Sequence, residues 1–424
     1  MFMKSGKNRC SLLILFTLLA GATSTFAGPP NVVILLGDDQ AWTDFGFMGH
    51  PEIKTPHLDR LAAQSACFAQ GYVPSSLCRP SLATLITGLY PHQHKIVGND
   101  PPKGINRAEM LRHIRSVPTL PKFLNEKGYL SFQSGKWWEG RPEDGGFTSG
   151  MTHGDPSRGG RHGDLGLKIG REGLKPVFDF IDGTGGKPFF LWYAPMMPHS
   201  PHNPPARLLA KYQKEGTPLP IAKYHAMCEW FDETCGELLA YLDQKNLAQE
   251  TLVVFVTDNG WIQLPNSPQY APKSKRSPYD GGLRTPILVR WPGKVTPQRI
   301  ETPVSSIDIA PTILAAVGVT PQAPLPGLDL VKLAAAGGKT DRTALYGEIF
   351  HHDVADLDRP EASLLFRWCR QDQWKLIQPG DASAPAELYD LSKDPREEHD
   401  LAAAHPDLVQ RLKQQIDGWW AVRQ

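Results

Sequence analysis

Two pairs of acidic or amide residues follow apolar, strand-like segments in this sequence. Residues 31–36 (NVVILL) lead to Asp38 and Asp39, and residues 251–256 (TLVVFV) lead to Asp258 and Asn259. Their carboxylate and amide oxygens are hard donors of the kind that bind Ca²⁺ or Mg²⁺. Asp and Asn are also common turn residues, so one pair alone predicts little. Two such pairs at the ends of apolar strands predict a divalent-cation site.

The elements that must position these pairs alternate between apolar strands and helices. Strands are predicted at 31–36, 129–133, 187–193, 251–256 and 286–290, and helices at 55–70, 118–127 and 221–246. Such alternation predicts an α/β fold with a large mixed, mostly parallel sheet between layers of helices. Ligands of these folds bind beyond the carboxyl ends of the strands, which is where both pairs lie.

The pattern changes after Gly318. Short strand-like pieces at 343–350, 363–369 and 374–378 precede a helix at 404–420. These pieces predict a small C-terminal α+β domain with a short antiparallel sheet. We therefore divide the chain into residues 1–27, a larger α/β domain at 28–318 and a smaller domain at 319–424.

The first 27 residues have the pattern of a signal peptide. Lys4, Lys7 and Arg9 precede the apolar run 12–19, and small residues follow up to Ala27. The run is shorter than the roughly 20 residues that a membrane anchor needs. We expect a protein that is secreted or periplasmic and has no membrane anchor. The 424 residues carry a formal net charge of only +1, which argues against nucleic acid as a partner.

The cysteine count leaves one residue over. Five cysteines follow the predicted cleavage point, and exported proteins usually pair theirs. Cys228 and Cys235 are seven residues apart on one predicted helix, or about 10 Å, which is too far for a disulfide. The sequence therefore does not predict a disulfide scaffold, and it leaves a cysteine free for another task.

The segment around Cys78, PSSLCRPSLATLITGLYPHQH, resembles the nucleophile segment of the type I sulfatases. This family of the alkaline phosphatase superfamily has the pattern Cys-x-Pro-x-Arg, followed by a short helix and Thr-Gly. Cys78, Pro80 and Thr87-Gly88 are in register with it. The resemblance implies that a maturation enzyme oxidises Cys78 to formylglycine, whose hydrated aldehyde is the nucleophile.

The resemblance covers nearly the whole chain after residue 27, in several segments that occur in the family's order. TLPKFLNEKGYLSFQSGKWW carries Lys136, KPFFLWYAPMMPHSPH carries His199, KSKRSPYDGGLRTPILVRWPG carries Lys275, and ELYDLSKDPREEHDLA is similar to the family's C-terminal strand and turn. Each segment alone is a weak signal, and their common order is a strong one.

The resemblance implies hydrolysis of sulfate monoesters, with a sulfated carbohydrate as the expected substrate. One divalent cation, Ca²⁺ or Mg²⁺, is expected on the residue made from Cys78 and on Asp38, Asp39, Asp258 and Asn259. Lys136 and Lys275 would neutralise the other sulfate oxygens. His199 is the expected acid for the leaving oxygen, and Asp258 the expected acceptor of the nucleophile's proton.

Two residues depart from the family's pattern. The family's Arg, four residues after the cysteine, is Leu82 here, and its Lys-Trp-His reads Lys136-Trp137-Trp138. Arg79, beside Cys78, is one candidate source of the missing guanidinium, and no substitute for the histidine is evident. Two alternatives therefore stay open. One is a phosphate or phosphonate ester hydrolase of the same superfamily, and the other is a non-catalytic binder of sulfated glycans with unconverted Cys78.

Overall fold

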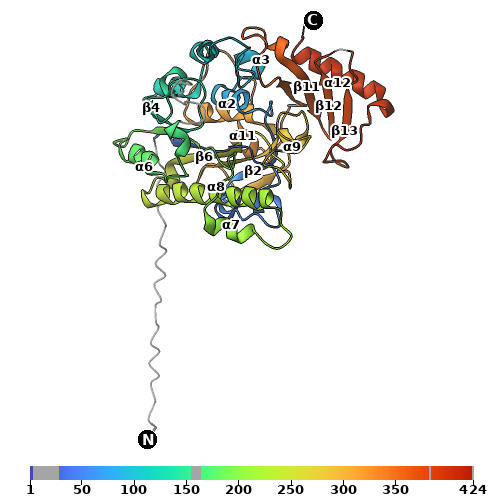
Figure 1. Ribbon diagram of the computed structural model, residues 1–424. Coiled ribbons are helices and arrows are strands. Elements are labelled where there is room, and N and C mark those ends of the chain that lie inside the picture. The colour runs from blue at the N-terminus through green and yellow to red at the C-terminus, as the bar shows by residue number, and fades with distance from the viewer. Residues whose placement is uncertain (3–27, 154–163, 382, 423–424) are drawn as a thin grey trace.

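The computed structural model describes residues 1–2, 28–153, 164–381 and 383–422. Nearly all of the predicted signal peptide, 1–27, lies outside the described residues. The described chain forms two sheets, one of nine strands and one of four (Figure 1). The larger has the order β4-β3-β5-β1-β6-β7-β2-β8, with β9 beside β2, and the smaller has the order β10-β11-β12-β13. The predicted fold class, a mostly parallel sheet between helices with a small antiparallel sheet, is confirmed.

The centre of the large sheet consists of apolar strands that are buried on both faces. β1 (Asn31–Gly37) lies between β5 (Phe189–Ala194) and β6 (Thr251–Thr257), parallel to both, and every residue of the three is buried. β3 (Leu130–Gly135) is parallel to β5, whereas β7 (Arg284–Arg290) is antiparallel to β6. Continuous Val, Ile, Leu and Phe runs suit such strands because neither face meets water.

Helices cover both faces of this sheet and form two cores. Val33 and Leu35 of β1 face one core, to which α8 (Leu219–Gln244), α1 (Pro56–Ala63) and α6 (Lys175–Asp182) contribute. Val32 and Ile34 face the other core, with α2 (Cys78–Thr87), α5 (Leu120–Asn125), α10 (Ile309–Ala316) and α11 (Leu330–Ala335). In Figure 1, α8 runs below the sheet and α2 lies above it.

The predicted helix at 55–70 is wrong in its second half. α1 ends at Ala63, and Ala66–Tyr72 forms strand β2, which pairs with β7 and β8. The helical spacing of apolar residues, which includes Leu58 and Leu61, does not continue beyond the end of α1 at Ala63. Pairing in the sheet buries Ala66 and Phe68 completely, so tertiary context decides this segment against its local pattern.

The smaller sheet packs against the larger one through polar as well as apolar contacts. Its strands are β10 (Leu345–Phe350), β11 (Leu364–Gln371), β12 (Trp374–Pro379) and β13 (Glu387–Asp390), with α12 (Pro406–Trp419) beside them. Trp368 donates to the carbonyl of Pro74 at 3.1 Å, and Lys375 reaches Asp280 at 2.8 Å. The domain boundary at 318/319 stays a prediction.

Short elements complete the chain. They are β4 (Ser149–Gly150), β8 (Gln298–Ile300), β9 (Val304–Ser305), α3 (Pro91–His94), α4 (Arg112–Ser116), α7 (Ala206–Tyr212) and α9 (Asp280–Leu283). No helix in the described ranges is long and apolar enough to cross a membrane. Within the described ranges, the cysteines at 67, 78, 228, 235 and 369 are all buried and free.

Candidate active site

The two acidic pairs meet at the carboxyl edge of the large sheet. Gly37 of β1 is in register with Thr257 of β6, so the residues that follow, Asp38 and Asp258, emerge at the same level. The backbone N–H of Asp258 donates to Gly37 O at 2.9 Å, and that of Asp39 donates to Asp258 Oδ1 at 3.0 Å. Adjacent parallel strands thus bring together residues 220 positions apart.

Asp39 is the most heavily contacted carboxylate of the site. Its Oδ1 accepts from Asn259 Nδ2 at 2.7 Å, and its Oδ2 lies 2.7 Å from Lys275 Nζ and 3.4 Å from His199 Nε2. Burial alone would raise the pKa of Asp39, but Lys275, His199 and Lys136 together hold it below its usual value. Asp39 is therefore a carboxylate that stays ionised in the interior.

Lys136 enters the site from the end of β3. Its backbone N–H donates to Ala194 O at 2.6 Å, and the preceding Gly135 has φ 83° with no room for a Cβ, which would lie 1.9 Å from that same oxygen. The Lys136 ammonium lies 2.5 Å from Asp38 Oδ1 and 3.1 Å from Asp258 Oδ2. Despite full burial, these carboxylates raise the pKa of Lys136 well above its usual value.

Lys275 reaches the same cluster from the loop before α9. α9, which follows this loop, lies against the end of β6, because Gly260 N–H donates to Gly282 O at 2.8 Å and Gly260 has no space for a side chain. Burial opposes the charged form of Lys275, but Asp39 raises its pKa above the usual value. Two cations and three carboxylates are thus buried within one group of contacts.

Cys78 and His199 complete the cluster. One ligand atom from each of Cys78, His199, Asp38 and Asp39 lies within 4.8 Å of the others. Cys78 is the first residue of α2 and is fully buried. His199 follows β5 and is 15% exposed at its side chain; its Nδ1 lies 2.6 Å from Ser200 O, a contact that places a proton on Nδ1. The structure therefore brings together all eight residues that the sequence singled out.

Burial dominates the titration of Cys78 and of its neighbour Asp258. It raises the pKa of the Cys78 thiol to about 12, against the opposing effect of Lys136 and Lys275. A thiol in this state is a poor nucleophile, since the thiolate is the reactive form. Burial also raises the pKa of Asp258 to about 7, although Lys136 acts to lower it. Asp258 can therefore exchange a proton near neutral pH.

The residues present fit a divalent cation. Asp38 Oδ2 and Asn259 Oδ1 are buried oxygen atoms for which the described residues provide no hydrogen-bond partner. Both are hard oxygen donors, and buried polar atoms are normally satisfied by some partner. Asp38, Asp39, Asp258 and Asn259 would hold the ion, together with the residue made from Cys78.

The structure accounts for one departure from the family's pattern and corrects an expectation. Leu82 is 4% exposed and packs in the apolar core under α2. Arg79 does not replace the missing guanidinium: its Nε and Nη2 lie 2.5 and 2.8 Å from the carboxylate of Glu139, and Nη1 and Nη2 donate to Gly98 O and Met110 O. The Arg79 guanidinium is therefore engaged in a buried ion pair rather than in the cluster around Cys78.

At the second departure, Trp138 lies under Lys136. The Lys136 ammonium is 4.7 Å from the centre of the Trp138 ring, a cation–π geometry. The indole thus contacts a lysine where the family has an imidazole. It supplies no proton acceptor, because indole nitrogen only donates.

Sequence reasoning missed two residues that hold the start of α2. Glu139 binds Arg79, and the side chain of Asn99 accepts the Arg79 backbone N–H at 3.0 Å. The only feature of the sequence that could have drawn attention to Glu139 is its position three residues after Lys136. Nothing near Cys78 in the chain points to Asn99, 20 positions beyond its partner.

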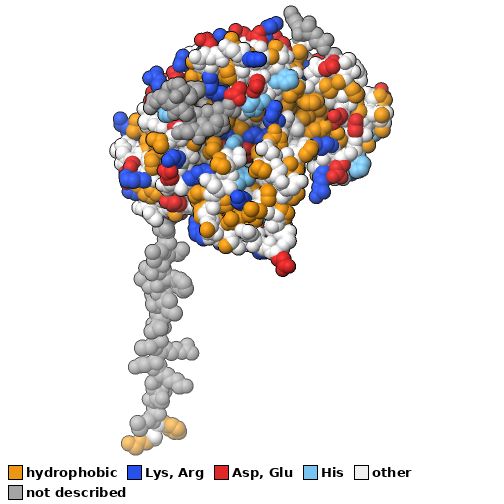
Figure 2. Space-filling model, viewed as in Figure 1, with side chains coloured by type: hydrophobic (Ala, Val, Ile, Leu, Met, Phe, Trp, Pro, Cys, Tyr) orange, Lys and Arg blue, Asp and Glu red, His pale blue; other side chains and the backbone are white. Residues whose placement is uncertain are grey.

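In the view of Figure 2, histidine, lysine and arginine side chains are exposed near the middle of the face, with acidic and hydrophobic side chains among them. The buried cluster of carboxylates and lysines at the sheet edge suits esters of a tetrahedral oxyanion. Fold and site together define a hydrolase of the alkaline phosphatase superfamily.

Comparison with known proteins narrows this class to a family. The profile of the family described as "Sulfatase" matches residues 30–319, and that described as "N-sulphoglucosamine sulphohydrolase, C-terminal" matches residues 270–420. The chain belongs to the sulfatase family, whose members hydrolyse sulfate esters.

Relatives and solved structures agree with this assignment. Human arylsulfatase A is 28% identical over an alignment that covers 95% of this chain and 89% of that protein. An enzyme solved with its substrate D-glucosamine-2-N,6-O-disulfate is similar in fold, with TM-score 0.74, 20% identity, and coverage of 92% of this chain and 97% of the other. A phosphonate monoester hydrolase of Agrobacterium radiobacter has TM-score 0.72 at 18% identity, covering 92% and 95%. The fold alone therefore does not distinguish sulfate from phosphonate esters.

Proposed function

We propose that this sulfatase removes sulfate groups from glycans. It would use one bound Ca²⁺ or Mg²⁺ and, as the nucleophile, a formylglycine made from Cys78. The observation that carries the proposal is the buried cluster in which Cys78 begins a helix beside Asp38, Asp39 and two lysines. A buried thiol whose pKa is near 12 would be inert as it stands, which supports its conversion to another nucleophile. A sulfated sugar as substrate is supported by the names of the matching C-terminal family and of the substrate-bound neighbour.

The residues of this site would share the work as follows. Lys136 and Lys275 bind sulfate oxygens and neutralise the charge that grows on them as the ester bond breaks. Asp258, with its pKa raised to about 7 by burial, takes the proton of the attacking hydroxyl. A bound divalent cation supplies Lewis-acid polarisation of the sulfate group.

His199 donates a proton to the leaving alcohol oxygen. Its Nδ1 is committed to Ser200 O, so Nε2 is the nitrogen that can face the substrate, and it must carry a proton to act as an acid. Burial lowers the pKa of His199, while Asp38 and Asp39 partly oppose the shift. Activity that depends on this acid is lost as pH rises above that lowered pKa.

Comparison of ester substrates tests the proposal. Protein purified from a host that has the maturation enzyme is assayed with para-nitrophenyl sulfate, para-nitrophenyl phosphate and phenyl phosphonate esters, and with sulfated disaccharides. We expect sulfate release from the aryl sulfate and from at least one disaccharide. Turnover of phosphonate or phosphate esters alone would instead favour the other superfamily activity, and saccharide binding without turnover of any ester would favour a binding protein.

We also propose that residues 1–27 direct export and are removed. The basis is the sequence pattern of basic, apolar and small residues. N-terminal sequencing of the protein from the periplasm or medium of its host tests this, and a mature chain that still begins at Met1 would contradict it.

A further inference from the structure

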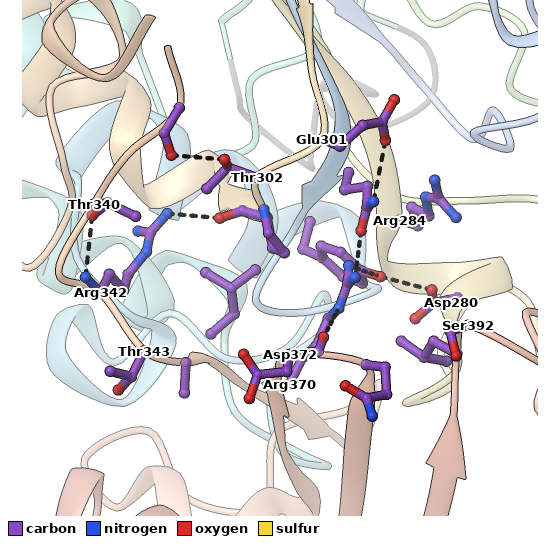
Figure 3. Close-up of a pocket in the computed structure, with 18 of the residues that line it drawn as sticks. Asp280, Arg284, Glu301, Thr302, Thr340, Arg342, Thr343, Arg370, Asp372 and Ser392 are labelled. Atoms are coloured by element: carbon purple, nitrogen blue, oxygen red, sulfur yellow. Dashed lines mark hydrogen bonds between the residues drawn. The ribbon is translucent and has the colours of Figure 1, made fainter. Parts of the chain in front are cut away.

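A cavity of about 740 Å³ lies between the large sheet and the smaller one (Figure 3). Its wall includes the ends of β2 and β7, the segment after β8, the loop after α11 and the turn between β11 and β12. None of the eight predicted catalytic and metal residues lines it. Its size is within the range of small-ligand sites, roughly 300–1,000 Å³.

Three cations of this cavity have no carboxylate partner. Across the described part of the chain, no carboxylate lies within 4.0 Å of Arg284, Lys339 or Arg370. Arg370 is 8% exposed and donates to Tyr72 Oη at 2.8 Å and to the side chain of Gln70. Both partners are neutral, and they donate in turn to Asp280 and Glu301, so Arg370 is linked to these anions only through neutral side chains.

Arg284 has a side-chain donor without an acceptor, and its charge acts on Asp280 and Glu301 although neither carboxylate lies within 4.0 Å. Its Nη2 donates to Ala69 O at 3.2 Å, and its guanidinium stacks 3.7 Å from the ring centre of Trp42. Its Nε is buried and has no acceptor among the described residues. A buried N–H without an acceptor is unfavourable, and an acceptor oxygen beside it would satisfy it.

Most anions of the cavity are already paired with other cations. Asp280 is held by Lys375 at 2.8 Å, and Glu301 by Arg299 at 2.7 Å. Arg342, the remaining cation of the wall, is paired with buried Asp308. Lys375 also pairs with Glu397 at 2.8 Å. Among the described residues of the wall, Asp372, in the exposed turn after β11, is the carboxylate outside these ion pairs, whereas Arg284, Lys339 and Arg370 are cations outside them. A partly enclosed space with this balance attracts anions.

The neutral groups of the wall are hydroxyls. Thr302, Thr340, Thr343 and Ser392 line the space beside the cations (Figure 3). A ligand that carries both an anionic group and many hydroxyl groups matches this lining. Trp42, which stacks on Arg284, lies three residues after Asp39, so Arg284 connects the wall of the cavity to the loop that carries two of the proposed metal ligands.

We infer that this cavity is an accessory binding site for sulfated saccharide, distinct from the catalytic cluster. The inference rests on the proposed function for the class of ligand. Arg284 and Arg370 bind a sulfate group at the floor of the cavity, Lys339 adds charge at its rim, and the hydroxyls contact the sugar. The site takes a second sulfated unit of a glycan, whereas a small aryl sulfate needs only the catalytic cluster.

Lysine footprinting tests the inference without requiring turnover. Lys339 is exposed and lines the cavity, and Lys294 is exposed and lies outside it. The full-length protein is acetylated with and without tetrasaccharides of chondroitin sulfate, heparan sulfate or carrageenan. We expect at least one tetrasaccharide to slow the acetylation of Lys339 severalfold and to leave the acetylation of Lys294 unchanged. The desulfated form of that tetrasaccharide is expected to give Lys339 no protection. If none of the three tetrasaccharides changed the rate of Lys339 acetylation relative to the protein alone, the inference would be overturned.

Variants give an independent readout. In Lys339→Glu and Arg284→Gln we expect KM for the protecting tetrasaccharide to rise roughly three- to tenfold, because charge-assisted contacts are lost. We expect kcat/KM for para-nitrophenyl sulfate to stay within about twofold, and Lys294→Glu to change neither value. An unchanged KM in both cavity variants would overturn the accessory site and leave the proposed function standing. If the wild-type protein did not hydrolyse para-nitrophenyl sulfate at all, that result would instead count against the proposed function.

Discussion

At the scale of residues, the site is a group of buried charges that nearly balance. Asp38, Asp39 and Asp258 face Lys136 and Lys275 with almost no contact with water. Burying such charges costs several kcal/mol per ion unless partners compensate. A cluster of this kind costs stability, and its presence at the edge of an otherwise apolar sheet indicates a functional site.

Lys275 is the clearest single residue to test. In Lys275→Gln the cation that faces Asp39 is lost, and we expect kcat/KM for para-nitrophenyl sulfate to fall by on the order of 10²–10³. Lys273→Gln is the matched control, because its ammonium contacts Glu397 O and the Tyr279 ring rather than the site. Wild-type kcat/KM in Lys275→Gln would show that this lysine does not act on the sulfate group.

The ion pair between Arg79 and Glu139 is predicted to stabilise the nucleophile's helix. Both side chains are at most 4% exposed, so Glu139→Gln leaves a buried guanidinium without its anion. We expect the free energy of unfolding to fall by about 3–5 kcal/mol. The control is Arg115→Gln, which breaks the exposed pair with Asp144 and should cost no more than about 1 kcal/mol. Equal losses in urea unfolding would contradict a structural role for the buried pair.

At the scale of elements, α2 packs an apolar residue on the core at a position where the family's pattern has a charged one. Leu82 occupies the position of the family's Arg and contributes to the core of that face. Restoring the family residue with Leu82→Arg is therefore expected to destabilise the protein by several kcal/mol, since a charge without a partner enters that core. Leu82→Met, which conserves volume, should cost less than about 1.5 kcal/mol. If Leu82→Arg unfolded at the same urea concentration and gained activity, the departure would have no structural basis.

The sequence predicted the elements that are buried on both faces. β1, β5 and β6 are continuous apolar runs, and their polar ends follow directly in the chain, so the meeting of Asp38 and Asp258 could be anticipated. The nucleophile and the two lysines came from the resemblance, since a lone lysine carries no signal of its own. The local pattern of apolar residues was sufficient to predict a strand wherever both faces of that strand are buried.

Features that depend on distant partners could not be predicted. Residues 66–72 look helical by local pattern and become β2 because β7 and β8 flank them. Arg79 was one candidate source of the missing guanidinium, but Glu139, 60 positions later, binds it. Both outcomes have one cause, because the deciding contact is tertiary and leaves no periodicity in the chain.

At the scale of the whole molecule, a buried network joins the two sheets close to the site. Lys375 of the smaller sheet lies 2.8 Å from both Asp280 and Glu397, and Asp280 also accepts from Tyr72 Oη at 2.7 Å. Asp280 opens α9, five residues after Lys275. The smaller sheet therefore supports the loop that delivers the second lysine.

Asp232 is predicted to make the stability of the whole molecule depend on pH. Burial raises its pKa from 3.8 to about 7, although Leu58 N–H and His57 N–H donate to it and act to lower it. Between these two values the folded state holds a proton that the unfolded state has released, so this group's contribution to stability falls as pH rises. The slope is at most about 1.4 kcal/mol per pH unit.

The comparison with Asp232→Asn isolates this effect. We expect the difference in unfolding free energy, wild type minus variant, to decrease steadily from pH 4 to pH 7. Urea unfolding at several pH values measures it. A constant or increasing difference would show that Asp232 stays ionised in the folded protein.

The central claim is that Cys78 becomes the nucleophile of a sulfate ester hydrolase. Mass spectrometry of the peptide that contains Cys78, taken from preparations of different specific activity, tests it most directly. We predict that the fraction of chains with formylglycine at position 78 rises in proportion to turnover of para-nitrophenyl sulfate. An unmodified thiol at Cys78 throughout a fully active preparation would contradict the account.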